Sequence, residues 1–267
     1  TEKEKEKEKE SITEAGVTPA SEGSTAQVSD SDSSSTEGEA PVDSETEEDE
    51  LTGIEEATEA LYDLYRSELD DYKIKTLLDI GCGRGGFMQR MISDGVICKG
   101  IDLSSVMVDE CKANGLDAQC VDISEVSGKY DAVVAIFDVL NFLNHDELLK
   151  FLDDVAQRLN DDGVFIADIN TLYGFSDVAE GTMSSENERE FLVVDAVFED
   201  EKLYTKFTLF EKNDDDKYTK YQDTIIQYFH KIKVFEKLPA LKLVDKQTFS
   251  LYDTKDKTLL IFKKRID

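Results

Sequence analysis

Apolar and polar positions follow two different patterns along the chain, and the first of them covers its middle part. Between residues 76 and 168, short apolar runs of strand length alternate with stretches whose apolar residues recur every three or four positions. Strands that alternate with helices in this way predict a parallel, doubly wound sheet. The predicted strands cover residues 76–80, 96–101, 116–121, 130–137 and 164–168.

Helix signals lie before and between these strands. Thr52 and Glu55 have the spacing of a capping box, which predicts that a helix begins near Thr52. Ser104 is positioned to cap a helix that ends near Gly115, and another helix is predicted over 146–160. The first of these helices carries its apolar residues on one face, namely Ile54, Ala57, Leu61, Leu64 and Tyr65.

The second pattern begins after Tyr173 and indicates antiparallel strands. Three segments, 191–198, 203–210 and 218–229, are rich in β-branched and aromatic residues, and turn residues occupy 213–215. Together they predict an antiparallel sheet, or lid, that is inserted into the main domain.

The C-terminal residues return to the main domain. A short helix is predicted over 230–238, and strands over 241–249 and 258–263 form a terminal antiparallel hairpin through a turn at 253–257. The expected fold class is therefore α/β: a doubly wound, mostly parallel, seven-stranded Rossmann-like sheet with a terminal antiparallel hairpin. The inserted β-rich lid is expected over 171–228.

Residues 1–50 differ from the rest in composition and predict a disordered acidic tail. A Glu-Lys repeat at 2–10 is followed by Ser, Thr, Gly, Asp and Glu, with almost no large apolar side chains. Such a segment buries too little apolar surface to offset the entropy lost on ordering. A solubilising tail is the favoured interpretation and a partner-binding tail the alternative, and the folded domain is expected over 51–267.

The net charge of −30 bears on partners. Residues 1–60 hold 20 acidic residues and 4 lysines, a net charge of −16, which leaves −14 for the remainder. Contacts to phosphate dominate the affinity of proteins for nucleic acid, so an acidic chain argues against nucleic acid as the main partner. An anionic membrane surface is disfavoured for the same reason.

The cysteines and the apolar runs bear on compartment. Cys82, Cys98, Cys111 and Cys120 show no metal-binding spacing, which favours free thiols and no metal site. No stretch resembles a signal peptide, and the longest apolar run, 132–137, is much shorter than a membrane span. A cytoplasmic location is therefore expected.

A glycine-rich turn follows the first predicted strand and precedes a helical pattern. Backbone N–H groups and a helix N-terminus meet at such a turn, where a nucleotide-like ligand can lie. The glycines fit both G-x-G-x-x-G, ending at Gly86, and D-x-G-x-G-x-G, which runs from Asp79 to Gly85. Asp79 favours the second spacing, because a carboxylate there suits a cationic amino-acid ligand and would repel a pyrophosphate.

A second carboxylate follows the next predicted strand. Asp102 lies about 20 residues beyond the glycines, the offset at which an acidic residue binds ribose hydroxyls. The sequence therefore predicts a nucleoside-containing ligand at the carboxyl ends of these strands.

These motifs resemble those of the class I S-adenosylmethionine (SAM)-dependent methyltransferases, and the resemblance covers residues from about 55 to 267. Residues 79–85 match the first motif of the family, and residues 100–104 are similar to the second. Residues 121–123 match the position that meets adenine in that family. Residues 160–165 are similar to the turn before strand five, although the usual Lys-Pro-Gly-Gly is altered.

A narrower similarity concerns the lid. Residues 137–143 and 167–173 resemble a bacterial subgroup that carries a β-rich lid after strand five. A lid strand of that subgroup contains a histidine motif, and here Asp223, Ile225 and Gln227 occupy comparable positions without the histidine. The narrower similarity thus implies architecture and leaves the acceptor open.

The resemblance implies that SAM is the methyl donor and gives roles to the motif residues. Asp79 would meet the amino group of the methionine moiety, Asp102 the ribose and Asp122 the adenine amino group. The backbone of Ile123 would contact the adenine ring, and residues 137–138 would flank the methionine arm. The set expected to bind the cofactor is Asp79, Gly81, Cys82, Gly83, Asp102, Leu103, Asp122, Ile123, Phe137 and Asp138.

Seven aromatic or polar residues are candidates for the acceptor pocket, and each has an ordinary structural alternative, which is slightly favoured for the set. Tyrosines are often half-buried packing residues, and asparagines often cap the next segment. Neither His145 nor His230 is expected to act in catalysis, and no catalytic residue is identified. The candidates are Tyr62, Tyr65, Asn141, Asn170, Tyr173, Tyr221 and Asp223.

The predicted function is methyl transfer from SAM to a small molecule. The sulfonium already activates the methyl group, so the protein mainly holds donor and acceptor close and aligned, an effect worth up to roughly 7–11 kcal/mol. Two alternatives remain: a nicotinamide-dependent oxidoreductase, which would need a second dinucleotide-binding half, and a non-catalytic SAM-binding or interaction protein. The sequence does not predict the oligomeric state.

Overall fold

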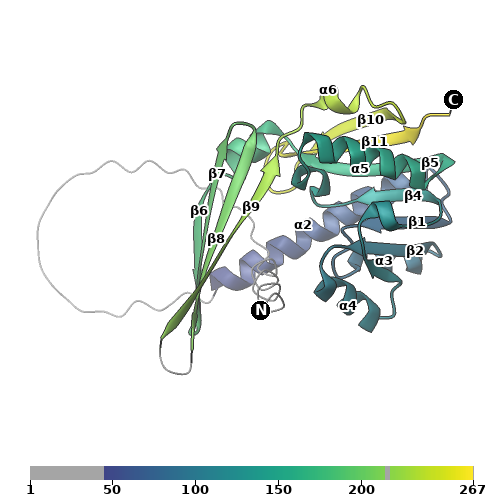
Figure 1. Ribbon diagram of the computed structural model, residues 1–267. Coiled ribbons are helices and arrows are strands. Elements are labelled where there is room, and N and C mark those ends of the chain that lie inside the picture. Colours follow the sequence, from purple (N-terminus) through teal and green to yellow (C-terminus); the bar gives the residue numbers. More distant parts are fainter. Residues whose placement is uncertain (1–44, 214–216, 267) are drawn as a thin grey trace, which may run out of the picture.

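The computed structural model describes residues 45–213 and 217–266 (Figure 1). The predicted tail lies outside the described residues up to residue 44, and the chain is already helical from Glu45. Helix α2 runs from Glu45 to Asp70. The predicted helix start at Thr52 is therefore wrong, because Thr52 lies inside α2.

A seven-stranded sheet forms the main domain, as predicted. Its strand order is β10-β11-β5-β4-β1-β2-β3. The five strands from β1 to β5 pair in parallel, whereas β11 pairs antiparallel with both β5 and β10. The strands are β1 (Thr76–Ile80), β2 (Ile97–Asp102), β3 (Ala118–Cys120), β4 (Tyr130–Ala135), β5 (Leu159–Asn170), β10 (Leu241–Phe249) and β11 (Lys257–Lys264).

Helices cover both faces of this sheet (Figure 1). Helices α2, α3 and α4 pack on the face that carries Ala132 and Val134, and α5 and α6 pack on the face that carries Val133. None of the helices in the described ranges is long and apolar enough to cross a bilayer. The remaining helical segments are α3 (Gly86–Ser93), α4 (Ser105–Ala113), η1 (Ile123–Glu125), η2 (Val139–Phe142), α5 (His145–Arg158), η3 (Gly174–Val178) and α6 (Ile232–Phe235).

A separate antiparallel sheet, which we call the lid sheet, is inserted between β5 and α6 and projects from the main domain (Figure 1). Its order is β6-β7-β8-β9, with a small apolar cluster centred on Val194 and Phe207. The end of β9 is joined to η2, since the Asn141 side-chain amide donates to the Tyr228 carbonyl at 2.8 Å. The strands are β6 (Gly181–Glu186), β7 (Glu190–Glu199), β8 (Lys202–Lys212) and β9 (Tyr218–Tyr228).

Several predicted boundaries differ from the structure for local reasons. Strand β4 ends at Ala135, because Phe137 and Asp138 both adopt left-handed backbone conformations, with φ of 64° and 60°. Strand β5 is assigned from Leu159, directly after α5, but its pairing with β4 shifts register between Leu159 and Val164, so an irregularity occupies residues 160–163, within the range expected to form the turn before strand five. The polar strand β6 was not predicted, and it forms through its pairing with β7.

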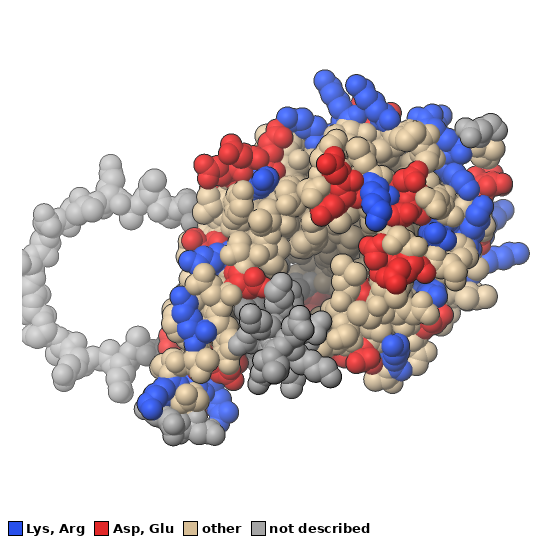
Figure 2. All heavy atoms as spheres, viewed as in Figure 1, with Lys and Arg blue, Asp and Glu red and all other residues tan. Residues whose placement is uncertain are grey.

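Charge is distributed unevenly over the folded part. Residues 217–267 carry 12 Lys and Arg against 6 Asp and Glu, although the chain as a whole has a net charge of −30. Figure 2 shows Lys and Arg side chains gathered along the edge that carries α6, β10 and β11 in Figure 1. The acidic balance of the whole chain therefore does not extend to this edge.

Candidate functional site

The glycine-rich turn between β1 and α3 has the left-handed backbone that its glycines permit. Gly81, Gly83 and Gly85 have φ of 70°, 52° and 80°. A Cβ at Gly85 would lie 2.3 Å from Leu116 Cδ1, whereas a Cβ at Gly83 would meet open space. Gly85 therefore serves packing beneath the turn, and Gly83 leaves the backbone accessible to a ligand.

Asp102 is fixed beside this turn. One carboxylate oxygen accepts the N–H of Gly83 at 2.9 Å, and the other accepts the N–H of Ser104 at 2.9 Å. Ser104 also caps α4 as predicted, because its hydroxyl accepts the N–H of Met107 at 3.3 Å. The carboxylate is half-buried at the end of β2 and keeps lone pairs for further hydroxyl donors.

Asp79 is a nearly buried carboxyl group on β1, with 2% of its surface exposed. Burial, together with the nearby negative charge of Asp102, raises the pKa of Asp79 to about 7. No hydrogen bond or ion pair forms to its side chain within the described part of the chain. A cationic ligand would stabilise the ionised form of this group.

The third carboxylate of the predicted set already has a structural role. Asp122 is exposed and caps η1, because its side chain accepts the N–H of Ser124 at 2.9 Å. Hydrogen bonding to the side chain of Ser124, together with this bond from its N–H, holds the pKa of Asp122 below its usual value. Ile123, which follows Asp122, is buried. Leu103, which follows Asp102, is 77% exposed, so of these two apolar residues of the predicted cofactor set only Leu103 has a side chain accessible to a ligand.

Cys82 and Tyr62 lie next to the turn. The Cys82 side chain is buried towards β2, where a Cβ at Gly100 would lie 2.7 Å from its Sγ, so only the backbone of Cys82 faces the turn. The Tyr62 ring lies 6.1 Å from the ring of Phe137, measured between centroids. All four cysteines are free thiols, in agreement with the sequence analysis.

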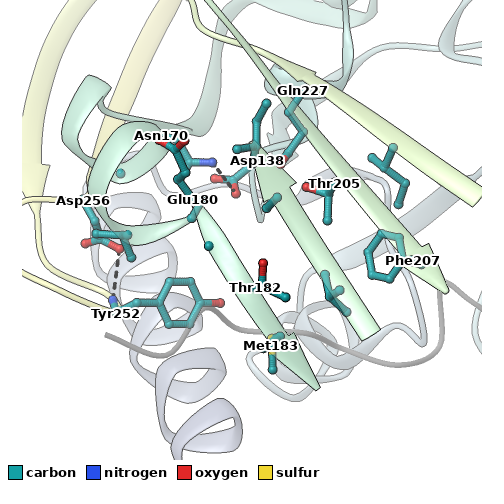
Figure 3. Close-up of a pocket in the computed structure, with 18 of the residues that line it drawn as sticks. Asp138, Asn170, Glu180, Thr182, Met183, Thr205, Phe207, Gln227, Tyr252 and Asp256 are labelled. Carbon is teal, nitrogen blue, oxygen red and sulfur yellow. Dashed lines mark hydrogen bonds between the residues drawn. The ribbon is translucent and has the colours of Figure 1, made fainter. Parts of the chain in front are cut away.

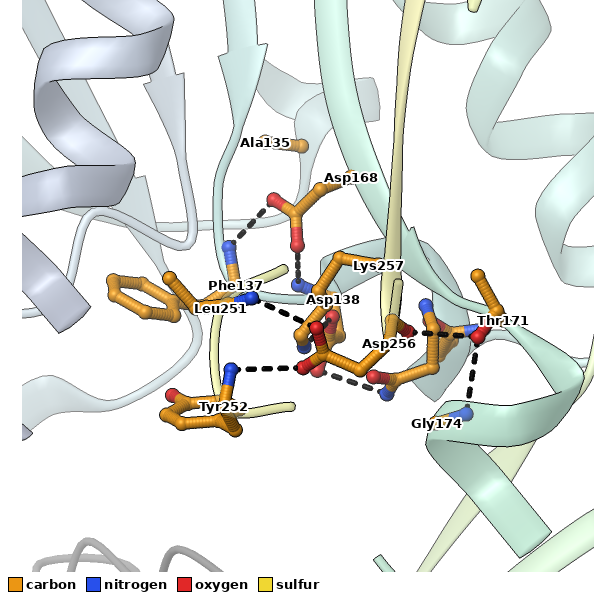
Figure 4. Close-up of polar contacts among 12 residues, drawn as sticks. Ala135, Phe137, Asp138, Asp168, Thr171, Gly174, Leu251, Tyr252, Asp256 and Lys257 are labelled. Carbon is orange, nitrogen blue, oxygen red and sulfur yellow. Dashed lines mark hydrogen bonds and ion pairs between the residues drawn. The ribbon is translucent and has the colours of Figure 1, made fainter. Parts of the chain in front are cut away.

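The segment that follows β4 is the most unusual part of the site. Phe137 and Asp138 are consecutive non-glycine residues with positive φ, and such positions cost of order 1–3 kcal/mol each. Their N–H groups donate to the two carboxylate oxygens of Asp168, at 3.0 and 3.1 Å (Figure 4). The Asp168 side chain on β5 therefore holds this segment, which we call the β4 tip, in a strained conformation.

Asp168 itself is fully buried and further anchored. The Tyr65 hydroxyl donates to Asp168 at 2.6 Å and lies 3.0 Å from the carbonyl of Ala135. Burial and the neighbouring charge of Asp138 raise the pKa of Asp168 to about 7, although Lys257 acts in the opposite direction. Tyr65 was predicted as an acceptor residue, and the structure places it here, where it joins α2 to the β4 tip.

Asp138 is bound from both sides. Lys257 on β11 forms an ion pair with one carboxylate oxygen, and the Asn170 side-chain amide donates to the other at 3.0 Å. Burial alone would lower the pKa of Lys257, but the charges of Asp138 and Asp168 outweigh it, so the pKa is raised. Lys257 therefore remains a cation.

A cavity of about 300 Å³ lies between the β4 tip and the lid sheet (Figure 3). Asp138 and Asn170 belong to its wall, so the cavity adjoins the predicted cofactor site. The lid side contributes mainly apolar residues. The lining is Asp138, Phe142, Asn170, Gly174, Val178, Ala179, Glu180, Gly181, Thr182, Met183, Val194, Ala196, Leu203, Thr205, Phe207, Ile225, Gln227, Tyr252, Asp256 and Lys257.

Of the seven predicted acceptor residues, only Asn170 lines this cavity. Asn141 is buried, and its side-chain oxygen accepts the Asn170 N–H at 2.9 Å, which is a structural role. Tyr173 is 41% exposed and donates to Asp253 at 3.0 Å. Tyr221 packs against the cluster inside the lid sheet, and Asp223 accepts the N–H of Thr224 at 2.8 Å.

Sequence reasoning missed Asp168, Lys257, Tyr252 and Asp256. Asp168 had one local signal, since it is a carboxylate at the end of the predicted apolar strand 164–168. Lys257 had none, because its partner is 119 positions away. Of the three positions compared with the lid-strand motif, Ile225 and Gln227 line the cavity.

Comparisons with known proteins agree with this geometry. Residues 77–163 match the model of a family described as a methyltransferase domain. A curated protein of Geobacillus sp. (strain WCH70), named “Putative methyltransferase”, is 25% identical over 198 residues, which are 67% of this chain and 80% of that protein.

Solved structures share the fold at low sequence identity. A SAM-dependent methyltransferase from Clostridium acetobutylicum is 22% identical, with a TM-score of 0.64 over 76% of this chain and 90% of that one. The sugar N-methyltransferase of Streptoalloteichus sp. has a TM-score of 0.65 at 14% identity, over 91% of this chain and 100% of that one. The SAM-bound amino pentose methyltransferase of Micromonospora echinaspora has a TM-score of 0.59 at 14% identity, over 85% of this chain and 100% of that one.

The burial of Asp79 makes a prediction about stability and pH in the ligand-free protein. Its pKa of about 7 in the folded state lies above the usual 3.8, so the folded protein holds more protons between these values and its stability falls as pH rises through them. The Asp79→Asn variant does not lose stability in this way. Its free energy of unfolding in urea, relative to that of the wild-type protein, should therefore rise by on the order of 2–3 kcal/mol between pH 5 and pH 7. Asp168 titrates in both proteins, so its effect cancels in this difference. The same difference between variant and wild type at both pH values would contradict the raised pKa of Asp79.

The ion pair between Lys257 and Asp138 makes a second prediction. Lys257→Met leaves a carboxylate at the β4 tip without its counter-ion and should cost about 3–5 kcal/mol of unfolding free energy. The double variant Lys257→Met/Asp138→Asn removes both charges, so it should be more stable than Lys257→Met alone. Chemical denaturation of the wild-type protein, Lys257→Met, Asp138→Asn and the double variant measures this coupling. If the losses of unfolding free energy in the two single variants add up to the loss in the double variant, the ion pair between Lys257 and Asp138 does not stabilise the β4 tip.

Proposed function

We propose that this chain, which contains a class I SAM-dependent methyltransferase domain, transfers the methyl group of SAM to a small molecule bound in the cavity beneath the lid sheet. The observation that carries the proposal is the position of Asp138. It follows β4, where the predicted cofactor site ends, and it lines the lid cavity. Donor and acceptor would therefore meet at the β4 tip.

The residues around the glycine turn fit the chemistry of SAM. Its methionine moiety carries a protonated amino group, which suits the nearly buried carboxyl group of Asp79. Asp102 is held by two backbone N–H groups and can accept the ribose hydroxyls. Asp122 and Ile123 follow β3 on the same edge of the sheet and would read adenine. When bound, SAM supplies a methyl group that its sulfonium has already activated.

The dimensions of the cavity favour a small acceptor. About 300 Å³ lies at the lower end of the range of small-molecule sites. The lid sheet forms one side of the cavity, and the β4 tip and the segment 252–257 form the other. Solved structures with the same fold include enzymes named for sugar and amino pentose methylation, which supports the same size class.

The protein's contribution to catalysis would be mainly alignment. The β4 tip is held by Asp168, and its side chain at Asp138 is held by Lys257 and Asn170, so the segment beside which donor and acceptor would meet is fixed. Such pre-organisation is the term worth up to roughly 7–11 kcal/mol in bimolecular reactions.

The two alternatives to an enzyme of this kind make different demands. An oxidoreductase of the dinucleotide type needs a second nucleotide-binding half, but in the described sheet β5 is followed by the antiparallel strands β11 and β10. A non-catalytic SAM-binding protein would bind SAM without transferring the methyl group to any acceptor. Incubation with tritiated SAM and a small-molecule cell extract distinguishes the two, because only an enzyme produces a labelled acceptor.

The assignment of Asp102 predicts a change in affinity. Asp102→Ala removes the acceptor for the ribose hydroxyls and the partner of the Gly83 N–H. Because hydrogen bonds to charged groups contribute about 1.5–3 kcal/mol, the Kd for SAM should rise roughly 10- to 100-fold in isothermal titration. Asp109→Ala, an exposed acidic residue on α4, is the matched control. Unchanged SAM affinity in Asp102→Ala would remove the ribose assignment.

The assignment of the cavity predicts a separation of donor and acceptor binding. Thr205→Phe fills the cavity from β8, whereas Thr208→Phe adds the same bulk on that strand outside the lining. Transfer of tritium from SAM to small molecules should fall at least about tenfold in the first variant and little in the second. The Kd for SAM should stay the same in both. Equal loss of transfer in the two variants would place the acceptor elsewhere.

A further inference from the structure

We propose that the acceptor is an amine, which binds as a cation against the carboxylates at the polar end of the lid cavity. The inference rests on the proposed function and specifies its substrate class. Figure 3 shows Asp138 and Glu180 on one side of the cavity, and Met183 and Phe207 on the other. The cavity therefore has an acidic end beside the β4 tip and an apolar end beneath the lid sheet.

The charge of the cavity wall excludes an anionic acceptor. Its charged lining residues are Asp138, Glu180, Asp256 and Lys257, which together carry a net charge of −2. Lys257 is the one cation of the described lining, and it is bound in the ion pair with Asp138. A carboxylate or phosphate on the acceptor would face two uncompensated carboxylates without a free cationic partner.

The buried carboxylates are held in place and keep capacity for a ligand. The oxygens of Asp256 accept the N–H groups of Leu251 and Tyr252 at 2.8 and 3.1 Å (Figure 4). Those of Asp138 are bound by Lys257 and Asn170. Each carboxylate oxygen has two lone pairs, so both groups can accept a further N–H donor.

The residues at the apolar end of the cavity indicate the chemistry of the rest of the acceptor. Val194, Leu203 and Phe207 from the lid sheet present apolar surface, and Thr205 and Gln227 add two polar side chains. The acceptor that matches these walls has an amino group at one end and a compact, largely apolar body with one or two polar groups. Such a molecule places its nitrogen beside the β4 tip.

The movement of charge during the reaction favours nitrogen as the acceptor atom. The ammonium group first loses a proton to a wall carboxylate or to water. The nitrogen lone pair then forms a bond to the methyl carbon as the carbon–sulfur bond breaks, and that electron pair stays on sulfur as a thioether. The positive charge passes from sulfur to nitrogen, which lies against Asp138 and Asp256, and their fixed negative charge stabilises the transition state.

Other acceptor atoms fit this site less well. A carboxylate or phenolate would neutralise the sulfonium charge as it reacts, so an acidic wall would raise the barrier. An alcohol enters as a neutral molecule, so its binding would leave the negative charge of the cavity wall uncompensated. The described residues also contain no cluster able to hold a metal ion.

The chemical class of the product tests the inference. The protein is incubated with tritiated SAM and a small-molecule cell extract. The labelled product is first separated from unreacted SAM, which is itself a cation, and is then passed over a cation exchanger at pH 7 and treated with alkali. An N-methyl product is retained and keeps its label. An O-methyl ether passes through, and a methyl ester releases labelled methanol; either result overturns the inference while leaving the proposed function intact. If SAM binds but no labelled product forms, the proposed function fails and this inference fails with it.

Charge reversal at the cavity rim gives a second test. Glu180→Lys adds a cation to the acidic end, so the KM for the purified amine should rise roughly tenfold or more, with the Kd for SAM unchanged. Glu186→Lys, an exposed residue of β6 outside the lining, is the matched control and should leave KM unchanged. An unchanged KM in Glu180→Lys, or an equal rise in both variants, would contradict the binding of a cation at this end.

Discussion

The carboxylate of Asp168 is the contact on which the site depends. It accepts the N–H groups of two consecutive residues with left-handed backbone and thereby stabilises a turn that non-glycine residues rarely adopt. Through Tyr65 it also joins helix α2 to β4 and β5. The segment held in this way lies next to the glycine turn, where a Cβ at Gly81 would lie 3.0 Å from Val139 Cγ2, and its residue Asp138 lines the lid cavity.

Negative charge is common to the two halves. Asp79 is nearly buried beneath the glycine turn without a counter-ion among the described residues, and the cavity wall has a net charge of −2, with Asp256 buried and Glu180 exposed at the rim. Buried carboxylates are costly unless a cation compensates them. A sulfonium donor and an ammonium acceptor that meet beside the β4 tip would provide that compensation. The same electrostatic argument thus underlies the proposed donor and the proposed acceptor class.

The parts of the structure that depend on local sequence were predictable. The strand, glycine turn and helix over residues 76–93 were predicted, because an apolar run, glycines and a 3.6-residue period lie within a single short stretch. The interior of the site was not, because its contacts span the chain: Asp168 lies 31 positions from Phe137, and Lys257 lies 119 from Asp138. Of the predicted acceptor residues only Asn170 lines the cavity, since hydroxyl and amide groups carry no local sign of which face they occupy.

A crystal structure with the demethylated product S-adenosylhomocysteine tests the central claim most directly. We expect its amino group to lie beside Asp79, its ribose hydroxyls to contact Asp102, and its sulfur to face the lid cavity beside Asp138. A complex in which the sulfur points away from this cavity, or in which the ligand lies outside the crevice between Asp79 and Asp102, would contradict it.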